Sequence, residues 1–349
     1  MAKIVAVDLF CGAGGLTRGL LDAGIDVVCG IDSDEKCSLT YESNNIRENG
    51  RSAKYIKTDI RQIDGNYIKN IFTGSGGDYF MLAGCAPCQP FSRKNVKRNT
   101  DGRVNLLTEF ARLIEATKPD FVFMENVPDI EKIHSEILSR FTDVLKNKGY
   151  FYDSSVINAK DYGVPQNRKR FVLIASKLSK ITIPLSLRDG NTGYITVKDA
   201  IGDTDKFPPI NAGESHEVIF NHRCSNLSKL NLKRLEYTPI DGGSRKSWPN
   251  ELVLECHKKI SGHWDAYGRM RWDSPAPTLT TRFSSITTGR YAHPEQNRAI
   301  SMKEGASIQS FPYEYKFYGN VQEISRQIGN AVPPKMAREI CKVFMECND

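Results

Sequence analysis

At 349 residues, with 40% hydrophobic and 26% charged residues and a modest net charge of +7, the sequence has room for one large domain and a smaller one. No apolar run approaches the roughly 20 residues that span a bilayer, and Met1 leads into a strand without a signal peptide's apolar region, so we expect a cytoplasmic protein with no membrane contact. Nine irregularly spaced cysteines without an export signal are typical of free thiols in a reducing compartment.

The chain begins with the pattern of a strand, a glycine turn and a helix. An apolar run from Lys3 to Phe10 predicts the strand, Cys11 to Gly15 form the turn, and Leu16 to Ala23 have helical spacing. Glycines let a ligand approach the backbone closely, and a helix amino terminus favours the ligand's polar end. The dinucleotide fingerprint is incomplete, because Thr17 stands where its third glycine belongs.

Two further strands end in carboxylates. Val27 to Ile31 leads into Asp32, about twenty residues after the glycine turn, where a carboxylate in this kind of fold reaches ribose hydroxyls. The alternative for this region is a helix cap, and Asp34 fits that role better than Asp32. The third strand, Tyr55 to Thr58, ends at Asp59 and Ile60.

Cys88 follows a buried strand, Tyr79 to Ala83, in a loop stiffened by prolines on both sides. A thiol presented in this way suits a nucleophile. The alternative is that Cys85 and Cys88 form a redox pair or half of a zinc site. Five basic residues against one Asp lie between Arg93 and Arg103; such a run is usually a solvated surface, but beside a nucleophile it is typical of a segment that closes over phosphates.

The middle of the chain continues the alternation of helices and strands. Leu106 to Thr117 predicts a helix, and the buried strand Asp120 to Met124 runs into Glu125, beside the strand that bears Cys88. A helix is expected at Ile137 to Lys148, and strands at Ser155 to Asn158 and Phe171 to Ala175. Alternate residues of a strand share a face, which predicts one face for Gln166, Arg168 and Arg170.

From Ile181 to Gln296, prolines and glycines divide the chain into short segments, which predicts a separate, smaller, β-rich domain. Its 15 basic and 13 acidic residues nearly balance. Arginines between Tyr267 and Arg290 alternate with short polar side chains, a pattern that can read base edges. After this segment Ser301 and Glu304 predict a capping box, and Gln327 to Pro334 precede a final amphipathic helix.

Several of these segments, in order, resemble motifs of the DNA cytosine-5 methyltransferases. They are Asp-Leu-Phe-x-Gly-x-Gly-Gly from Asp8, Pro-Cys-Gln around Cys88, Glu-Asn-Val from Glu125, Gln-x-Arg-x-Arg from Gln166, Thr-Leu at Thr278, and the segments from Arg298 and Gln327. The resemblance implies an α/β, Rossmann-like catalytic domain that takes a methyl group from S-adenosyl-L-methionine and leaves S-adenosyl-L-homocysteine as the product. This catalytic domain would comprise residues 1–180. A target-recognition domain would follow at 181–296, and the segment 297–349 would complete the catalytic domain.

The resemblance also implies roles for single residues. The catalytic set is Cys88, Glu125 and Arg168, with Arg168 facing the base and its phosphate. The cofactor set is Phe10, Gly12, Gly14, Gly15, Leu16, Asp32 at the ribose, Asp59 and Ile60 at the adenine, Asn330 and Val332. The DNA-binding set is Gln89, Ser92, Arg93, Lys94, Lys97, Arg98, Arg103, Arg170 with a structural role, Arg269, Arg271, Thr278 and Arg282.

The expected reaction is methyl transfer to carbon 5 of a flipped-out cytosine in a specific double-stranded DNA sequence, through a covalent Cys88 adduct. The protein would be monomeric, without a metal, and could work beside a restriction endonuclease of the same site in a bacterial cell. A tRNA cytosine-5 methyltransferase of the same fold is the alternative, although the insert of roughly a hundred residues favours DNA. A catalytically silent DNA-binding relative and a nucleotide-dependent dehydrogenase are the remaining alternatives.

Overall fold

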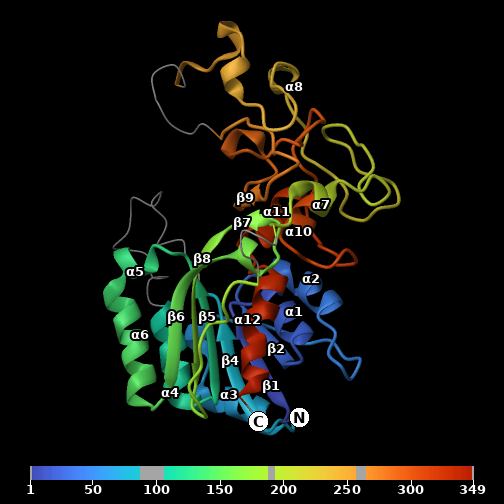
Figure 1. Ribbon diagram of the computed structural model, residues 1–349. Coiled ribbons are helices and arrows are strands. Elements are labelled where there is room, and N and C mark those ends of the chain that lie inside the picture. Colours follow the sequence, from blue (N-terminus) through green and yellow to red (C-terminus); the bar gives the residue numbers. More distant parts are fainter. Residues whose placement is uncertain (1, 87–105, 188–192, 257–264, 348–349) are drawn as a thin grey trace. The chain divides into compact units, whose positions relative to one another are not determined.

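The computed structural model describes residues 2–86, 106–187, 193–256 and 265–347, and the chain divides into two compact units (Figure 1). We call them the sheet unit, with Met1–Asn158, Lys169–Leu187 and Val332–Asp349, and the loop unit, with Ala159–Arg168 and Arg188–Ala331. These units differ from the predicted boundaries at 181 and 297, because residues 159–168 and 297–331 belong to the loop unit and residues 181–187 to the sheet unit.

The described part of the sheet unit is built on seven strands in the order β3-β2-β1-β4-β5-β8-β6. They are β1 (Ile4–Leu9), β2 (Asp26–Asp32), β3 (Lys54–Lys57), β4 (Tyr79–Gly84), β5 (Phe121–Asn126), β6 (Phe151–Asn158) and β8 (Lys169–Ser176). The strands from β3 to β5 are parallel, and β8 runs antiparallel to both β5 and β6. The chain builds outward from β1 through β2 and β3 and then returns to β4 on the other side of β1. The carboxyl ends of β1 and β4 therefore flank a switch point, where open α/β sheets bind ligands.

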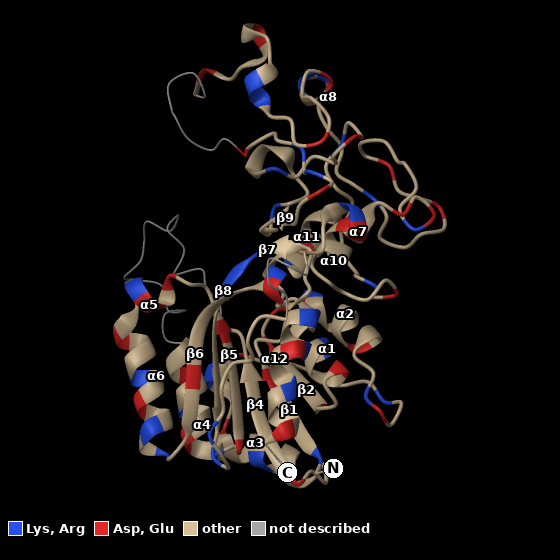
Figure 2. Ribbon diagram, viewed as in Figure 1, with Lys and Arg blue, Asp and Glu red and all other residues tan. Residues whose placement is uncertain are grey.

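Helices cover both faces of this sheet (Figure 1). On one face, Val122 and Met124 belong to a core that includes apolar residues of α4 (Leu106–Thr117) and α6 (Ser135–Asn147). On the other face, the ring of Phe121 meets Phe344 of α12 (Pro334–Glu346) at 5.3 Å between centroids. Strands covered on both faces read as continuous apolar runs, which is why they were predictable. Charges are absent from β4 and follow α6 along its length (Figure 2).

The remaining helices are short. Those of the sheet unit are α1 (Gly15–Asp22), α2 (Ser38–Asn44), α3 (Gly65–Thr73) and α5 (Ile130–Ile133). Those of the loop unit are α7 (Val197–Ile201), α8 (Lys229–Glu236), α10 (Met302–Ile308) and α11 (Val321–Asn330). Among the described residues, no helix has the length and apolar character needed to cross a bilayer.

The loop unit does not show the expected β-rich structure in its described residues. Its named strands are β7 (Gln166–Asn167) and β9 (Ala276–Pro277), which pair in parallel, and the rest is loops, single 3-10 turns and short helices. Prolines and glycines that suggested many short strands instead interrupt pairing, because proline cannot donate to a ladder and glycine gains little from one.

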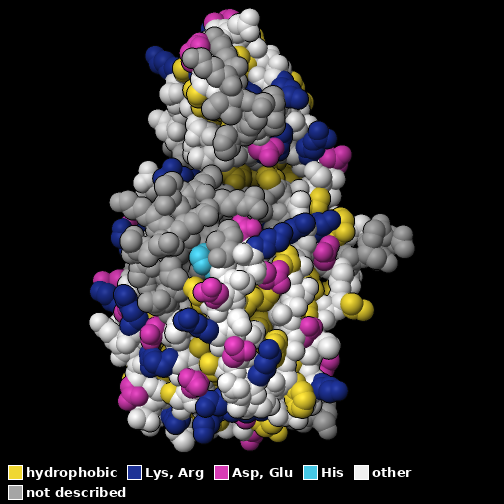
Figure 3. Space-filling view, turned by 90° about the vertical axis from the view of Figure 1, so that its left-hand side faces the viewer, with side chains coloured by type: hydrophobic (Ala, Val, Ile, Leu, Met, Phe, Trp, Pro, Cys, Tyr) yellow, Lys and Arg dark blue, Asp and Glu magenta, His cyan; other side chains and the backbone are white. Residues whose placement is uncertain are grey.

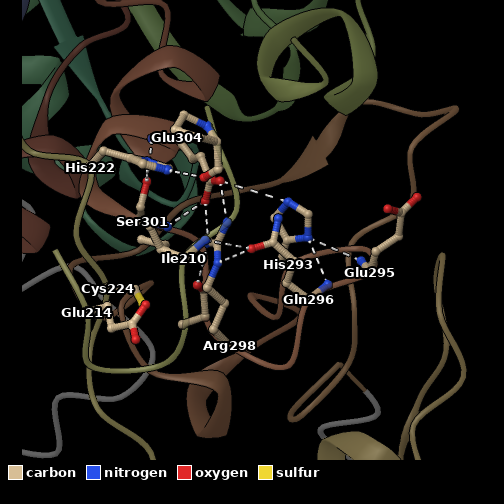
Figure 4. A network of polar contacts seen from close by, with 12 residues as sticks. Ile210, Glu214, His222, Cys224, His293, Glu295, Gln296, Arg298, Ser301 and Glu304 are labelled. Atoms are coloured by element: carbon tan, nitrogen blue, oxygen red, sulfur yellow. Dashed lines mark hydrogen bonds and ion pairs between the residues drawn. The ribbon is translucent and has the colours of Figure 1, made fainter. Parts of the chain in front are cut away.

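A buried polar network centred on Arg298 and Glu304 holds the interior of the loop unit (Figure 4). The Arg298 guanidinium donates to both carboxylate oxygens of Glu304 at 2.7 Å, and both side chains are fully buried. The predicted capping box at the start of α10 is confirmed: Ser301 accepts from the Glu304 amide, and Glu304 accepts from the Ser301 amide. The same carboxylate thus begins a helix and neutralises a buried arginine.

Candidate active site

The glycine turn joins β1 to α1 and leaves its backbone open. Gly12 and Gly14 have φ angles of +49° and +87°, in the left-handed region that glycine adopts without strain. A side chain added at Gly12 would meet no atom within 4 Å, so open space lies beside this residue. Gly14 is the N-cap residue of α1. Leu16, which was also predicted to contact the cofactor, is a buried residue of this helix. A ligand could therefore approach the turn at Gly12.

Asp32 lies at the end of β2 and holds the turn. One carboxylate oxygen accepts from the Gly12 amide and the other from the Asp34 amide, both at 2.9 Å. Burial raises the pKa of Asp32 above its usual range despite these two amide donors. The structure thus brings together Gly12 and Asp32, which were predicted to bind the same cofactor. Asp34 accepts from the Lys36 amide and begins a 3-10 turn, as the helix-cap alternative expected.

The residues predicted to meet the adenine have other contacts in this structure. The Asp59 carboxylate pairs with Arg61 at 2.5 Å, and this partner lowers the pKa of Asp59. The Ile60 side chain is buried in the core of the sheet unit. Phe10 is half-buried and has a φ of +58°, which turns the chain at the end of β1. The cofactor roles of these three residues remain predictions.

The sequence reasoning did not identify Asp8, close to the end of β1, as a buried polar residue near the glycine turn. Thr17 of α1 donates to the Asp8 carboxylate at 2.6 Å and is 2.9 Å from the Tyr41 hydroxyl. Burial raises the pKa of Asp8 to about 7, against the lowering effect of the Thr17 hydrogen bond. Asp8 lies inside an apolar run, so the apolar pattern hid it; an acidic residue in a buried strand was the available signal.

Glu125 ends β5, the strand beside β4, and its partner is Arg170. The Arg170 Nε atom lies 2.9 Å from a Glu125 carboxylate oxygen, and the Glu125 side chain is only 6% exposed. Antiparallel pairing places Asn126 opposite Phe171, so Arg170, the second residue of β8, lies beside the end of β5. The arrangement fixes a carboxylate at the carboxyl end of the sheet, held by a neighbouring cation.

Arg168 differs from the expectation that it faces the substrate base. Its guanidinium is buried in the loop unit and donates to the carbonyl oxygens of Leu279, Gly329 and Ala331 at 3.0 to 3.1 Å. The strand is interrupted at this residue, because β7 ends at Asn167 and β8 begins at Lys169. Arg168 is therefore held as a structural group, and Arg170, expected to be structural, lies at the candidate catalytic carboxylate.

Of the arginines predicted to read DNA, Arg269 requires the clearest correction. Its side chain is buried and donates to the carbonyl oxygens of Leu235, Thr238, His293 and Gln296, which leaves it no role at a DNA surface. Arg271 and Arg282 are exposed, in keeping with a surface role. Thr278 donates to the Asn167 carbonyl at 2.7 Å. DNA contact by these last three residues stays a prediction.

Part of the predicted site lies outside the described residues. This part consists of Cys88, Gln89, Ser92, Arg93, Lys94, Lys97, Arg98 and Arg103. Cys85 is described, and its side chain is partly exposed. Among the described residues no three His, Cys, Asp or Glu side chains are placed to hold a metal ion. Figure 3 shows that on one face the described Lys and Arg residues are interspersed with Asp and Glu.

The predicted contacts at the end of the chain fall in different units. Asn330 ends α11 in the loop unit, and Val332 is a buried residue of the sheet unit just before α12. Their contact with a cofactor remains a prediction.

The fold and the residues at the strand ends define a Rossmann-like methyltransferase, and comparison with known proteins identifies the family. The model of the C-5 cytosine-specific DNA methylases matches residues 4–346. The type II methylase M.HgiDII of Herpetosiphon aurantiacus is 41% identical over 344 residues, covering 96% of this chain and 93% of that protein. The type II methyltransferase M1.HphI of Haemophilus parahaemolyticus is 33% identical and covers 99% of this chain and 88% of that protein. The chain belongs to the C-5 cytosine-specific DNA methylase family.

Solved structures agree with this fold. A DNA modification methyltransferase encoded within a prophage of E. coli has a TM-score of 0.75 and 24% identity, covering 99% of this chain and 100% of that one. The Entamoeba histolytica methyltransferase EhMeth has a TM-score of 0.68 and 17% identity, with 99% of both chains covered. At these identities the likeness establishes the Rossmann-like fold alone.

Proposed function

We propose that this enzyme transfers a methyl group from S-adenosyl-L-methionine to carbon 5 of a cytosine flipped out of a specific double-stranded DNA sequence, through a covalent adduct with Cys88. The observation that carries the proposal is the buried Glu125–Arg170 pair at the end of β5. This strand neighbours β4, and Cys88 follows the end of β4 closely in the sequence. A nucleophile and a fixed carboxylate from adjacent strand ends can act on one ring.

The sheet unit also fits the proposed methyl donor. The open space at Gly12 admits a ligand against the backbone, and Asp32 lies next to that turn with its carboxylate positioned by two amides. A carboxylate at this point of a Rossmann-like fold can accept hydrogen bonds from ribose hydroxyls. When bound, S-adenosyl-L-methionine supplies an electrophilic methyl group. Phe10, Asp59, Ile60, Asn330 and Val332 are proposed to complete its site.

The chemistry assigned to the protein begins with the weak nucleophilicity of cytosine carbon 5. Addition of the Cys88 thiolate to carbon 6, with Glu125 holding a proton at ring nitrogen 3, gives an enamine whose carbon 5 can accept the methyl group. Loss of the carbon 5 proton and departure of Cys88 then restore the aromatic ring. Arg170 orients the Glu125 carboxylate in this scheme. A stacked base is inaccessible to Cys88, so the cytosine must leave the helix.

The relatives also support a DNA substrate, because they are named type II methylases or methyltransferases. The basic run from Arg93 to Arg103 would supply phosphate contacts, and exposed Arg271 and Arg282 would lie near the bases. We propose that the enzyme acts as a monomer and that a restriction endonuclease of the same site accompanies it.

The test is bisulfite sequencing of plasmid DNA from cells that express the protein, with Cys88→Ala and Cys85→Ala as a matched pair. We expect methylation at one sequence for the wild type and for Cys85→Ala. Cys88→Ala should abolish methylation and still bind duplex DNA, because the thiol makes the covalent bond and not the docking contacts. A duplex with fluorine at carbon 5 should trap the wild type, since that carbon then has no proton to lose. Normal turnover by Cys88→Ala would refute the mechanism.

A further inference from the structure

Arg168 joins two segments of the loop unit that lie about fifty residues apart in the sequence. We call residues 278–281 the threonine segment and residues 329–331 the asparagine turn. The Nη1 atom of Arg168 donates to the Leu279 carbonyl, while Nη2 donates to those of Gly329 and Ala331. A single guanidinium therefore fixes the distance between the two segments, since its planar fork of donors has a rigid geometry.

A second buried route joins the same two segments. The Leu279 amide donates to the Gln166 side chain at 3.0 Å, and Gln166 donates to Gln309 at 2.5 Å. Gln309 in turn donates to the Ala331 carbonyl at 2.6 Å. All three side chains in the two routes are almost fully buried, so no solvent is available to replace a lost donor.

The segments also touch directly. A side chain added at Gly329 would overlap the Thr280 carbonyl oxygen, so only glycine permits this approach. Ser325 of α11 donates to the Thr281 carbonyl at 3.0 Å. Thr278 is held from both sides, through its hydroxyl by the Asn167 carbonyl and through its own carbonyl by the Tyr291 hydroxyl. Neither segment can move without displacing the other, because the contacts are close-packed and directional.

We propose that Gln166 and Arg168 are positioning residues that couple target DNA at the threonine segment to the methyl donor at the asparagine turn. The inference rests on the proposed function, together with the expected contact of Thr278 with DNA and the proposed contact of Asn330 with the donor. DNA that holds the threonine segment in one position thereby holds the asparagine turn in one position as well, and the donor binds more tightly. Coupling of this kind is reciprocal and typically changes affinity by about 5- to 150-fold.

The experiment measures the dissociation constant of S-adenosyl-L-homocysteine by calorimetry, without DNA and with a saturating duplex that carries the methylated sequence. The ratio of the two constants is compared among the wild type, Arg168→Lys and Arg269→Lys. The control arginine is matched, because Arg269 is also buried in the loop unit and donates to four backbone carbonyls, none of them in either segment. Lysine keeps the charge in both variants and cannot span several carbonyls.

We expect the wild-type ratio to be at least about 5-fold, to fall to about 1 in Arg168→Lys, and to persist in Arg269→Lys. A wild-type ratio in Arg168→Lys, or an equal loss in Arg269→Lys, would overturn the proposal. Where Arg168→Lys does not fold, Gln166→Met is measured in its place, and an unchanged ratio there also overturns it. A wild type that methylates DNA with a ratio of 1 would defeat this coupling alone. A wild type that binds neither duplex nor S-adenosyl-L-homocysteine would defeat the proposed function as well.

Discussion

Replacing Glu304 by Gln tests how much the buried ion pair contributes to the loop unit. Arg298 donates to both Glu304 oxygens, and the Ser301 amide donates to one of them at 2.6 Å (Figure 4). Burial alone would raise the pKa of Glu304, but Arg298, His293 and the Ser301 amide together lower it to about 2 from an ordinary 4.5. At 1.36 kcal/mol for each pKa unit, this shift corresponds to about 3 kcal/mol.

The sign of the pH effect follows from the depressed pKa. The contribution of Glu304 to the free energy of unfolding is fully present above pH 4.5 and is lost as the pH falls toward 2. In Glu304→Gln this contribution is absent at every pH, and the Arg298 charge stays buried without a carboxylate. Breaking a buried pair in this way costs about 3 to 5 kcal/mol. We therefore expect a loss of that size at pH 7.

The assay is urea unfolding followed by circular dichroism at pH 7 and pH 4. The matched control is Glu323→Gln, the same chemical change in a capping box of α11 that lies at the surface, for which we expect a loss of at most about 1 kcal/mol. The free energy of unfolding at pH 7 minus that at pH 4 should also be shifted in the negative direction in Glu304→Gln relative to the wild type, because the stability that Glu304 gains over this interval is absent. Equal losses in the two variants, or an unchanged pH dependence, would refute the reasoning.

Three further predictions concern Arg170, the segment 181–296 and Asp8. Arg170→Gln should lower kcat by about 100-fold, because Glu125 loses the partner that orients it for proton transfer; steady-state kinetics that match the wild type would contradict this. Exchanging residues 181–296 for those of a relative should change the DNA sequence that is methylated, as measured by bisulfite sequencing. An unchanged methylation pattern would show that the residues that recognise the DNA sequence lie elsewhere. In Asp8→Asn the fall in the free energy of unfolding between pH 4 and pH 7 should be smaller than in the wild type. A pKa raised to about 7 from 3.8 makes the contribution of Asp8 to that fall about 4 kcal/mol, and equal pH dependence of the two proteins in urea unfolding would refute the assignment.

The strands of the sheet were predictable because they depend on local sequence. β1, β4 and β5 are covered on both faces, so each appears in the sequence as an apolar run that leads to a candidate functional residue. The predicted helix from Leu106 to Thr117 has the same bounds as α4. Capping at Ser301 and Glu304 is likewise a pattern of four residues that needs no distant partner.

Roles that depend on distant partners could not be predicted. Strand alternation placed Gln166, Arg168 and Arg170 on one face, but the strand is interrupted at Arg168, and its acceptors lie more than a hundred residues away. The same limit explains Arg269, whose carbonyl partners are scattered from Leu235 to Gln296. A sequence gives the chemical type of a side chain but not the backbone atoms that surround it.

Buried arginines have a particular use in a unit with few paired strands. Arg168, Arg269 and Arg298 are among the largest fully buried side chains, and all belong to the loop unit. A sheet satisfies its backbone carbonyls through ladders, whereas the loops here leave carbonyl oxygens pointing inward without strand partners. One guanidinium has five donors and can satisfy several such oxygens from different segments, as Arg168 and Arg269 do. An arginine-rich stretch in a loop-built unit can therefore combine internal cross-links with exposed side chains. Of the four arginines from Arg269 to Arg290, only the exposed Arg271 and Arg282 stay candidates for DNA contact, because Arg290 also donates to the backbone carbonyls of Gly242, Gly243 and Arg269.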